Sequence, residues 1–165
     1  MAAAVVAIGT LVALRQDSAD RTRPVMVAEL KSAVLTKNAE LLVRNTGQSV
    51  ARDVVVEFDP PLPEGGDLTP FIRRRYSKPI PTFAPGMVMD NYYQGHDDSE
   101  PVPDECTITF CYRDSHGRRY TDSYPLTMAT VRDQTGAYPS SKYEGAMEKR
   151  LTEAVEALAR NFGRH

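Results

Sequence analysis

Residues 106–112, CTITFCY, alternate between apolar and polar side chains, and this pattern constrains the fold more than any other in the sequence. Successive residues of a β-strand point to opposite faces of a sheet, so the alternation predicts a half-buried strand. The predicted core face carries Cys106, Ile108, Phe110 and Tyr112, and the opposite face carries Thr107, Thr109 and Cys111.

The two cysteines of the chain lie on opposite faces of this one strand. Five strand steps separate the Cα atoms of Cys106 and Cys111 by about 16 Å, whereas a disulfide needs them within roughly 7 Å. We therefore predict two free thiols, which are typical of a reducing compartment. The pair also cannot form a zinc motif, because such motifs place cysteines close together around a turn.

Further strands are predicted on the N-terminal side of this segment. AELLVRN (39–45) and ARDVVVEF (51–58) are strand-like, and Asn45-Thr46-Gly47 supplies the turn residues between them. Val25 and Val27 open an earlier strand. The proline-rich stretch 59–66 breaks the sheet, and an irregular segment follows it.

Pro85-Gly86, within the segment 79–89, marks a turn into another strand. In the last hairpin, Asp114-Ser115-His116-Gly117 has the residues of a tight turn. We predict that the core includes Val56, Phe58, Ile108 and Phe110.

These patterns predict a mainly β protein, an immunoglobulin-like antiparallel β-sandwich over residues 24–130. A polar linker at 15–23 precedes it, and a linker at 131–140 leads to an amphipathic helix at 141–162. Ser141 and Glu144 form a capping box at the start of that helix. Its apolar stripe consists of Met147, Leu151, Val155, Leu158 and Phe162.

Residues 1–14 form an apolar segment without a single charged side chain. As a helix it would be about 21 Å long, which is short of the roughly 30 Å hydrocarbon core of a bilayer. Arginines follow it and no basic residue precedes it, which favours a cytoplasmic location for the rest of the chain. We interpret the segment as a possible membrane anchor. The alternative is a helix that packs on its own domain or in an oligomer interface, which would make the protein cytoplasmic.

Two short motifs are candidates for an interaction surface. Arg73, Arg74 and Arg75 form a basic run, although a solvent-exposed loop explains it as well. Adjacent Tyr92 and Tyr93 must face opposite sides of a strand, so one of them is expected to be exposed. The net charge of -2 and the lack of a second basic stretch argue against nucleic-acid binding. The helical stripe offers a third surface, for its own domain, a second copy or another protein.

Catalytic chemistry is not predicted. His116 belongs to a turn, and His96, Asp97, Asp98 and Glu100 lie in a polar loop without the spacing of a known metal motif, so we interpret them as a solvated acidic loop. The sequence contains no nucleophile elbow, phosphate-binding loop or dinucleotide fingerprint. We expect no enzyme activity, cofactor, metal or small-molecule substrate.

Three stretches resemble the bacterial immunoglobulin-like modules of the CARDB type: VRNTGQSVARDVVVEFDPPLP (43–63), IPTFAPGMVM (80–89) and ITFCYRDSHGRRYTDSYPL (108–126). The chain is also similar to actinobacterial proteins that join one N-terminal membrane helix to one such sandwich. This resemblance implies a fold and no reaction. We expect a protein-binding or scaffolding module tethered to the cytoplasmic face of a membrane; the alternative is a structural subunit of an assembly such as a phage or prophage particle.

Overall fold

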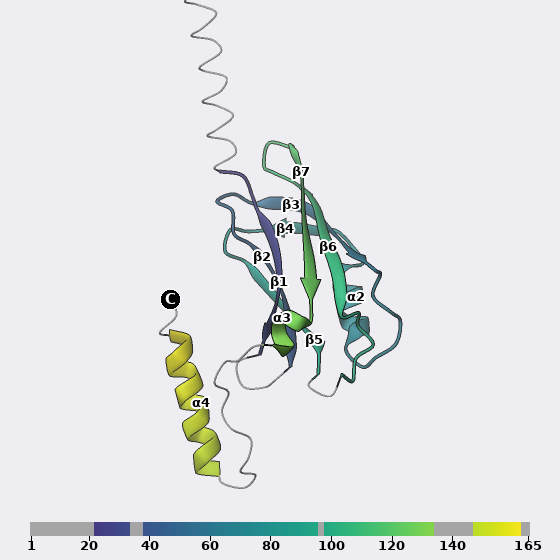
Figure 1. The fold of residues 1–165 in the computed structure, drawn as a ribbon. Helices are drawn as coiled ribbons and strands as arrows, with labels where there is room; N and C mark the ends of the chain where they lie inside the picture. Colours follow the sequence, from purple (N-terminus) through teal and green to yellow (C-terminus); the bar gives the residue numbers. More distant parts are fainter. Residues whose placement is uncertain (1–21, 34–37, 96–97, 134–146, 163–165) are drawn as a thin grey trace, which may run out of the picture.

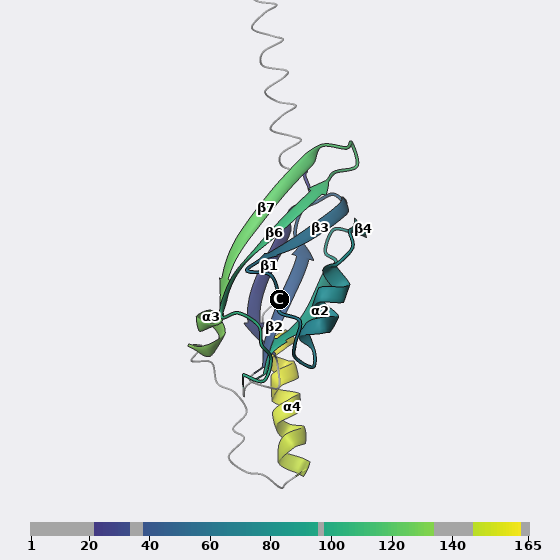
Figure 2. The same cartoon turned by 90° about the vertical axis from the view of Figure 1, so that its right-hand side faces the viewer.

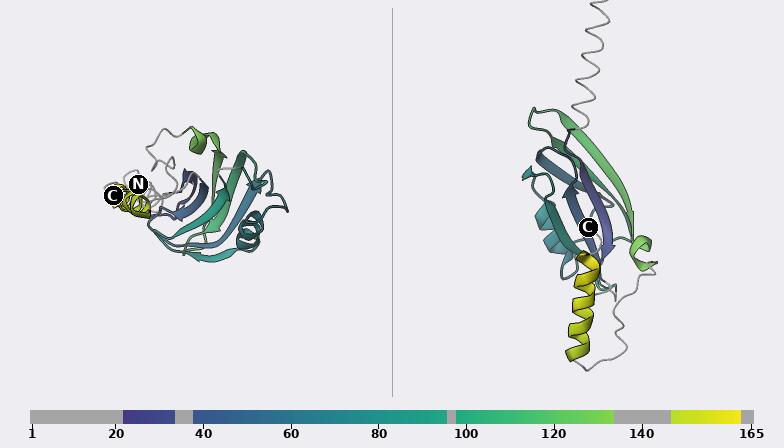
Figure 3. Two further views of the ribbon diagram at one scale, coloured as in Figure 1. Left: turned by 90° about the horizontal axis from the view of Figure 1, so that it is seen from below. Right: turned by 90° about the vertical axis from the view of Figure 1, so that its left-hand side faces the viewer.

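The computed structural model describes residues 22–33, 38–95, 98–133 and 147–162, and in them two antiparallel sheets pack face to face (Figure 1 and Figure 3). The first sheet has the strand order β1-β2-β5, and the second has the order β4-β3-β6-β7. The strands are β1 (Met26–Ser32), β2 (Ala39–Asn45), β3 (Ala51–Asp59), β4 (Ile80–Phe83), β5 (Val88–Gln94), β6 (Glu105–Arg113) and β7 (Arg119–Thr127).

Three helices accompany the sheets in these ranges: α2 (Thr69–Tyr76), α3 (Ala129–Arg132) and α4 (Met147–Phe162). No helix within the described ranges is long and apolar enough to cross a membrane. The proposed anchor at 1–14 and the capping box of Ser141 and Glu144 lie outside those ranges. Val131 of α3 is buried, so the packed part of the chain extends past the predicted end of the sandwich at residue 130.

The hydrophobic core lies between the sheets and confirms the alternation predicted for β6. Cys106, Ile108, Phe110 and Tyr112 are buried, whereas Cys111 is exposed on the other face. Both cysteines are free, as predicted. The largest fully buried side chains are Tyr93, Phe83, Phe110, Met26, Leu41 and Ile108.

One residue of the predicted core is wrong. Phe58 is only half-buried, because it lies near the end of β3 and packs against Tyr76 of α2 at a ring-centroid distance of 5.8 Å. In β1, Met26 and Ala28 face the core, whereas Val27 between them is only partly buried.

Residues 67–78, predicted to be irregular, contain α2. Ile72 and Tyr76 are one turn apart on this helix and are both buried, so its inner face closes one side of the sandwich. Arg73, Arg74 and Arg75 therefore lie on a helix and not on a loop. The prediction missed α2 because Leu68, at its N-cap position, makes no side-chain capping bond.

Asn45, at the end of β2, connects three segments of the chain and is only 1% exposed. Its Nδ2 donates to the carbonyl oxygens of Ser49 at 2.8 Å and of Phe83, in the other sheet, at 2.9 Å. Its Oδ1 accepts the backbone N–H groups of Val25 at 3.2 Å and Gly47 at 3.0 Å. The predicted turn is thus confirmed, and its first residue also holds the incoming chain and the β4–β5 connection.

The chain enters the sandwich beside this turn. A Cβ atom at Gly47 would lie 2.4 Å from both the Arg23 carbonyl oxygen and the Val25 nitrogen, so only glycine allows the backbones to approach this closely. Asp122 of β7 accepts the Met26 N–H at 3.0 Å and pairs with Arg23 at 3.3 Å. This carboxylate joins the edges of the two sheets at the point of entry.

We predict that Asn45→Ala lowers the free energy of unfolding by about 3 kcal/mol, because two carbonyls and two N–H groups lose their partner in a place with little access to water. Urea denaturation measures the change. Thr46→Ala is the control: Thr46 is exposed, so the loss should stay below about 0.5 kcal/mol. Equal losses for the two variants would contradict the role given to Asn45.

Candidate functional site

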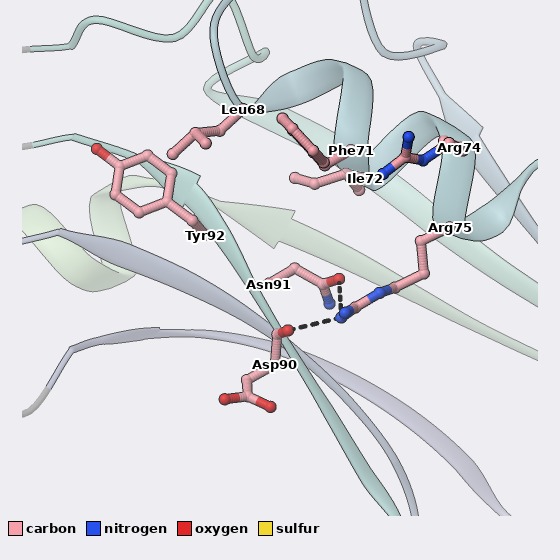
Figure 4. A pocket seen from close by; sticks show the side chains of 8 residues that line it. All are labelled: Leu68, Phe71, Ile72, Arg74, Arg75, Asp90, Asn91 and Tyr92. Carbon is pink, nitrogen blue, oxygen red and sulfur yellow. Dashed lines mark hydrogen bonds between the residues drawn. The ribbon is translucent and has the colours of Figure 1, made fainter.

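A pocket of about 420 Å³ lies between α2 and β5 (Figure 4). Its volume falls in the range of sites that bind a few side chains or a small molecule. One wall is the side of α2 that faces β5, and the other is β5, an edge strand of the three-stranded sheet. The lining residues are Leu68, Phe71, Ile72, Arg74, Arg75, Asp90, Asn91 and Tyr92.

Glu100 holds the start of α2 in place, although it lies 31 residues further along the chain than Thr69. Its carboxylate accepts the backbone N–H groups of Asp67, Leu68 and Thr69 at 3.1, 2.9 and 3.0 Å. The Thr69 hydroxyl donates to it at 2.7 Å. A carboxylate at this position satisfies the free N–H groups of the first turn and interacts favourably with the helix dipole.

Glu100 was predicted to lie in a solvated acidic loop, and for this residue the prediction is wrong. Glu100 is 5% exposed. Burial alone would raise the pKa of Glu100, but the hydrogen bonds from Thr69, Leu68 and Asp67 outweigh it and lower the pKa below the ordinary 4.5. Of the other predicted members, His96 and Asp97 lie outside the described ranges, and Asp98 is exposed and pairs with Arg132 at 2.8 Å.

Arg75 and Asn91 fix the floor of the pocket. The Arg75 guanidinium donates 2.7 Å hydrogen bonds to the Asp90 carbonyl oxygen and to Asn91 Oδ1. Asn91 Nδ2 in turn donates to the Tyr76 hydroxyl at 2.9 Å and to the Leu41 carbonyl oxygen at 3.0 Å. These bonds tie the C-terminal turn of α2 to the edge of the three-stranded sheet, so the pocket has a defined shape.

The rim of the pocket is both apolar and cationic. Phe71 is 56% exposed, and the Arg74 guanidinium lies over its ring at 5.1 Å from the centroid. Neither Arg74 nor Arg75 makes an ion pair within the part of the chain that the structure describes. Figure 4 shows the Asp90 carboxylate pointing away from both arginines. The pocket therefore suits a group that combines an apolar part with a negative charge.

The structure brings together three of the five residues singled out in the two short motifs. Arg74, Arg75 and Tyr92 line the pocket. Arg73 points elsewhere and forms a 3.3 Å surface pair with Glu64. Tyr93 is 1% exposed and donates to the Pro103 carbonyl oxygen, so it belongs to the core and not to a contact surface. Leu68 and Phe71 were missed because α2 was not predicted, although Pro70 in its first turn and the arginines in its last turn are signals that could have found it.

The stripe on α4 is a second, separate apolar surface. Leu151, Val155 and Leu158 are 68%, 57% and 55% exposed, so the sandwich does not cover them. Packing of these three residues on their own domain, one of the predicted alternatives, is therefore not seen. Figure 3 shows α4 on a different side of the molecule from α2.

His116 lies in the predicted turn between β6 and β7. Asp114 Oδ1 accepts the backbone N–H groups of His116 and Arg118 at 2.8 and 2.9 Å, and Gly117 has a φ of 81°. The predicted turn is confirmed, and Asp114 stabilises it through these hydrogen bonds. Among the described residues, no three His, Cys, Asp or Glu side chains are grouped as metal ligands would be.

The geometry defines a mainly β domain of two packed antiparallel sheets with a lateral pocket. Residues 1–132 match a protein family described as "Domain of unknown function (DUF8453)". The match spans well over half of the 165 residues, so the chain belongs to this family. A comparison with curated proteins finds no significant match.

We predict that Glu100→Gln destabilises the protein by about 2 kcal/mol at pH 7, because a neutral amide accepts these hydrogen bonds more weakly than a carboxylate. The folded-state pKa of Glu100 is lowered, so its contribution is complete above the unfolded-state pKa and disappears as the pH falls through the folded-state value. Stability measured against pH should therefore fall less steeply below pH 4.5 in the variant than in the wild type.

Glu64→Gln is the matched control, since Glu64 is an exposed partner in a surface ion pair and should contribute little. An acid limb of equal steepness for Glu100→Gln and the wild type would refute the capping role of Glu100.

Proposed function

We propose that this protein is a non-catalytic protein-binding or scaffolding module that uses the pocket between α2 and β5 as its main contact surface. The observation that carries the proposal is the composition of that pocket. Exposed Phe71 and half-buried Tyr92 provide apolar area, and the guanidiniums of Arg74 and Arg75 lack carboxylate partners among the described residues. Aromatic and arginine side chains around one pocket are the combination that dominates protein interfaces.

The sandwich itself is proposed to be immunoglobulin-like. In the constant-type arrangement, the third, sixth and seventh strands form one sheet and the first, second and fifth belong to the other. The strand orders β1-β2-β5 and β4-β3-β6-β7 agree with that division, with β4 paired to β3. A sandwich of this kind offers edges and lateral surfaces for partners, which supports a binding role.

The exposed stripe of α4 is proposed as a second contact surface. Leu151, Val155 and Leu158 form an apolar face that a soluble monomer would usually cover. An amphipathic helix can insert this face into a groove of another protein or of a second copy. Two contact surfaces on different sides of one domain suit a scaffold.

We further propose that residues 1–14 tether the domain to the cytoplasmic face of a membrane. The segment has no charged residue, and Arg15, Arg21 and Arg23 follow it. Positive charge directly after an apolar segment favours retention of that side in the cytoplasm. The two free cysteines agree with a reducing compartment.

Photo-crosslinking tests the pocket. We expect a photoreactive amino acid at position 71, in the full chain in its native cells, to give a discrete crosslinked product that disappears when Arg74→Glu is added. The same amino acid at Thr109, on the exposed face of β6, is the control and should give none. Equal crosslinking from the two positions, or a product that is insensitive to Arg74→Glu, would reject the pocket as the contact surface.

Membrane fractionation tests the tether. The full chain is expected in the membrane fraction, and a version that begins at Asp17 is expected in the soluble fraction, because the apolar residues alone provide the anchor. If both versions are equally soluble, the tether does not exist.

A further inference from the structure

Three arginines from three neighbouring strands lie in one row at the end of the four-stranded sheet. The strand register pairs Arg113 of β6 with Arg52 of β3 on one side and with Arg119 of β7 on the other. All three residues are exposed. Directly paired residues point to the same face of a sheet and have Cβ atoms about 5 Å apart, so three positive charges lie side by side.

The row keeps a net positive charge, because its arginines outnumber the acidic residues beside it. None of the three arginines makes an ion pair in the described ranges. The two nearest acidic residues along the chain are Asp114, whose carboxylate is bound inside the β6–β7 turn, and the exposed Asp53. Like charges directly opposite one another destabilise a sheet. An arrangement that costs stability and that an anionic surface would relieve indicates a binding role.

Apart from the row, every charged residue in the strands of this sheet is acidic. These residues are Asp53, Glu57 and Asp59 of β3, Glu105 of β6, and Asp122 of β7, whose carboxylate binds the entering chain. The positive charge is thus concentrated at one end of the sandwich, the end that includes the β6–β7 turn.

The chain enters the domain at this same end. Arg23 donates to the hydroxyl of Tyr112, the residue before Arg113, and its guanidinium lies over the ring of Tyr120, the residue after Arg119. Figure 1 and Figure 2 both show the start of the described N-terminal segment beside the β6–β7 turn. Only residues 15–21 separate the apolar segment 1–14 from Thr22, and seven residues reach at most about 25 Å.

From these observations we propose that the row of Arg52, Arg113 and Arg119 docks on an anionic lipid surface and so orients the tethered domain with the β6–β7 turn toward the membrane. This inference rests on the proposed tether. Cytoplasmic leaflets carry anionic lipids, and the short linker keeps the arginines within reach of them. Figure 2 shows α2 on the side of the domain, away from the β6–β7 turn. Docking would therefore leave the pocket beside α2 open to a protein partner.

Cys111 provides a reporter for this contact. It is exposed and lies two residues before Arg113 on the same face of β6, whereas Cys106 is buried. Burial also raises the pKa of the Cys106 thiol, which further slows its reaction with a maleimide. A maleimide dye added to the native full chain should therefore label Cys111, and peptide mapping verifies the position.

The test mixes the labelled full chain with vesicles that contain lipids with a spin-labelled, quenching headgroup. We expect strong quenching of the dye in vesicles of phosphatidylcholine and phosphatidylglycerol, and weak quenching in vesicles of phosphatidylcholine alone. Each arginine near an anionic surface raises the docked-to-undocked ratio of the protein roughly fivefold. The double variant Arg113→Gln with Arg119→Gln should therefore lower this ratio about 30-fold. The melting temperature of this variant should stay equal or rise, because the repulsion between the two guanidiniums is removed.

Arg73→Gln with Arg74→Gln on α2 is the control with the same change of charge, and it should leave the quenching unchanged. The proposal is overturned by equal quenching in neutral and anionic vesicles, by equal effects of the two double variants, or by a dye that responds to an oligonucleotide and not to anionic vesicles. Co-sedimentation with neutral vesicles reports the tether separately. One outcome is that the full chain fails to co-sediment with neutral vesicles while the quenching in anionic vesicles persists and depends on Arg113 and Arg119. In that case the tether is wrong and the docking surface is supported.

Discussion

The structure depends on one buried amide, that of Asn45, which joins parts of the chain that no strand pairing joins. Its Nδ2 donates to Ser49 after the β2–β3 turn and to Phe83 of the opposite sheet, and its Oδ1 accepts the N–H group of Val25 in the entering segment. A buried amide is stabilising only when its partners are all present, so these segments fold together or not at all. Gly47 and Asp122 complete the arrangement, since Gly47 leaves room for the entering backbone and Asp122 accepts its next free N–H group.

The fixed point of entry determines how the other surfaces are oriented. The row of Arg52, Arg113 and Arg119 lies at the end where the chain enters, and the pocket between α2 and β5 lies on the side of the sandwich. Glu100 positions α2 from a distant loop, as Asn45 positions the entering segment. In both cases a buried polar side chain makes several backbone hydrogen bonds, and these bonds give the proposed contact surfaces a defined place in the domain.

All strands except β4 could be predicted from the sequence, because each of them has its own periodic pattern or turn. The alternation from Cys106 to Tyr112 and the turn at Asn45 are local signals, and the structure has both. α2 has only weak local signals, a proline in its first turn and arginines in its last, because its capping carboxylate comes from Glu100 and its buried face consists of only a few residues. The arginine row is equally invisible in the sequence, since Arg52 and Arg113 become neighbours only through the register of β3 and β6. The pocket could be predicted only in part, from Arg74, Arg75 and Tyr92, because its shape depends on α2.

Amide hydrogen exchange measured residue by residue tests most directly whether Asn45 fixes the entering segment to the core. The N–H groups of Val25 and Gly47 both donate to Asn45 Oδ1, although Val25 precedes the first strand and Gly47 lies in a turn. Our account predicts that both amides exchange as slowly as that of Phe110 in the core, through global unfolding. Exchange of Val25 and Gly47 at the rate of an exposed turn amide would show that the entering segment opens independently, and would contradict the account.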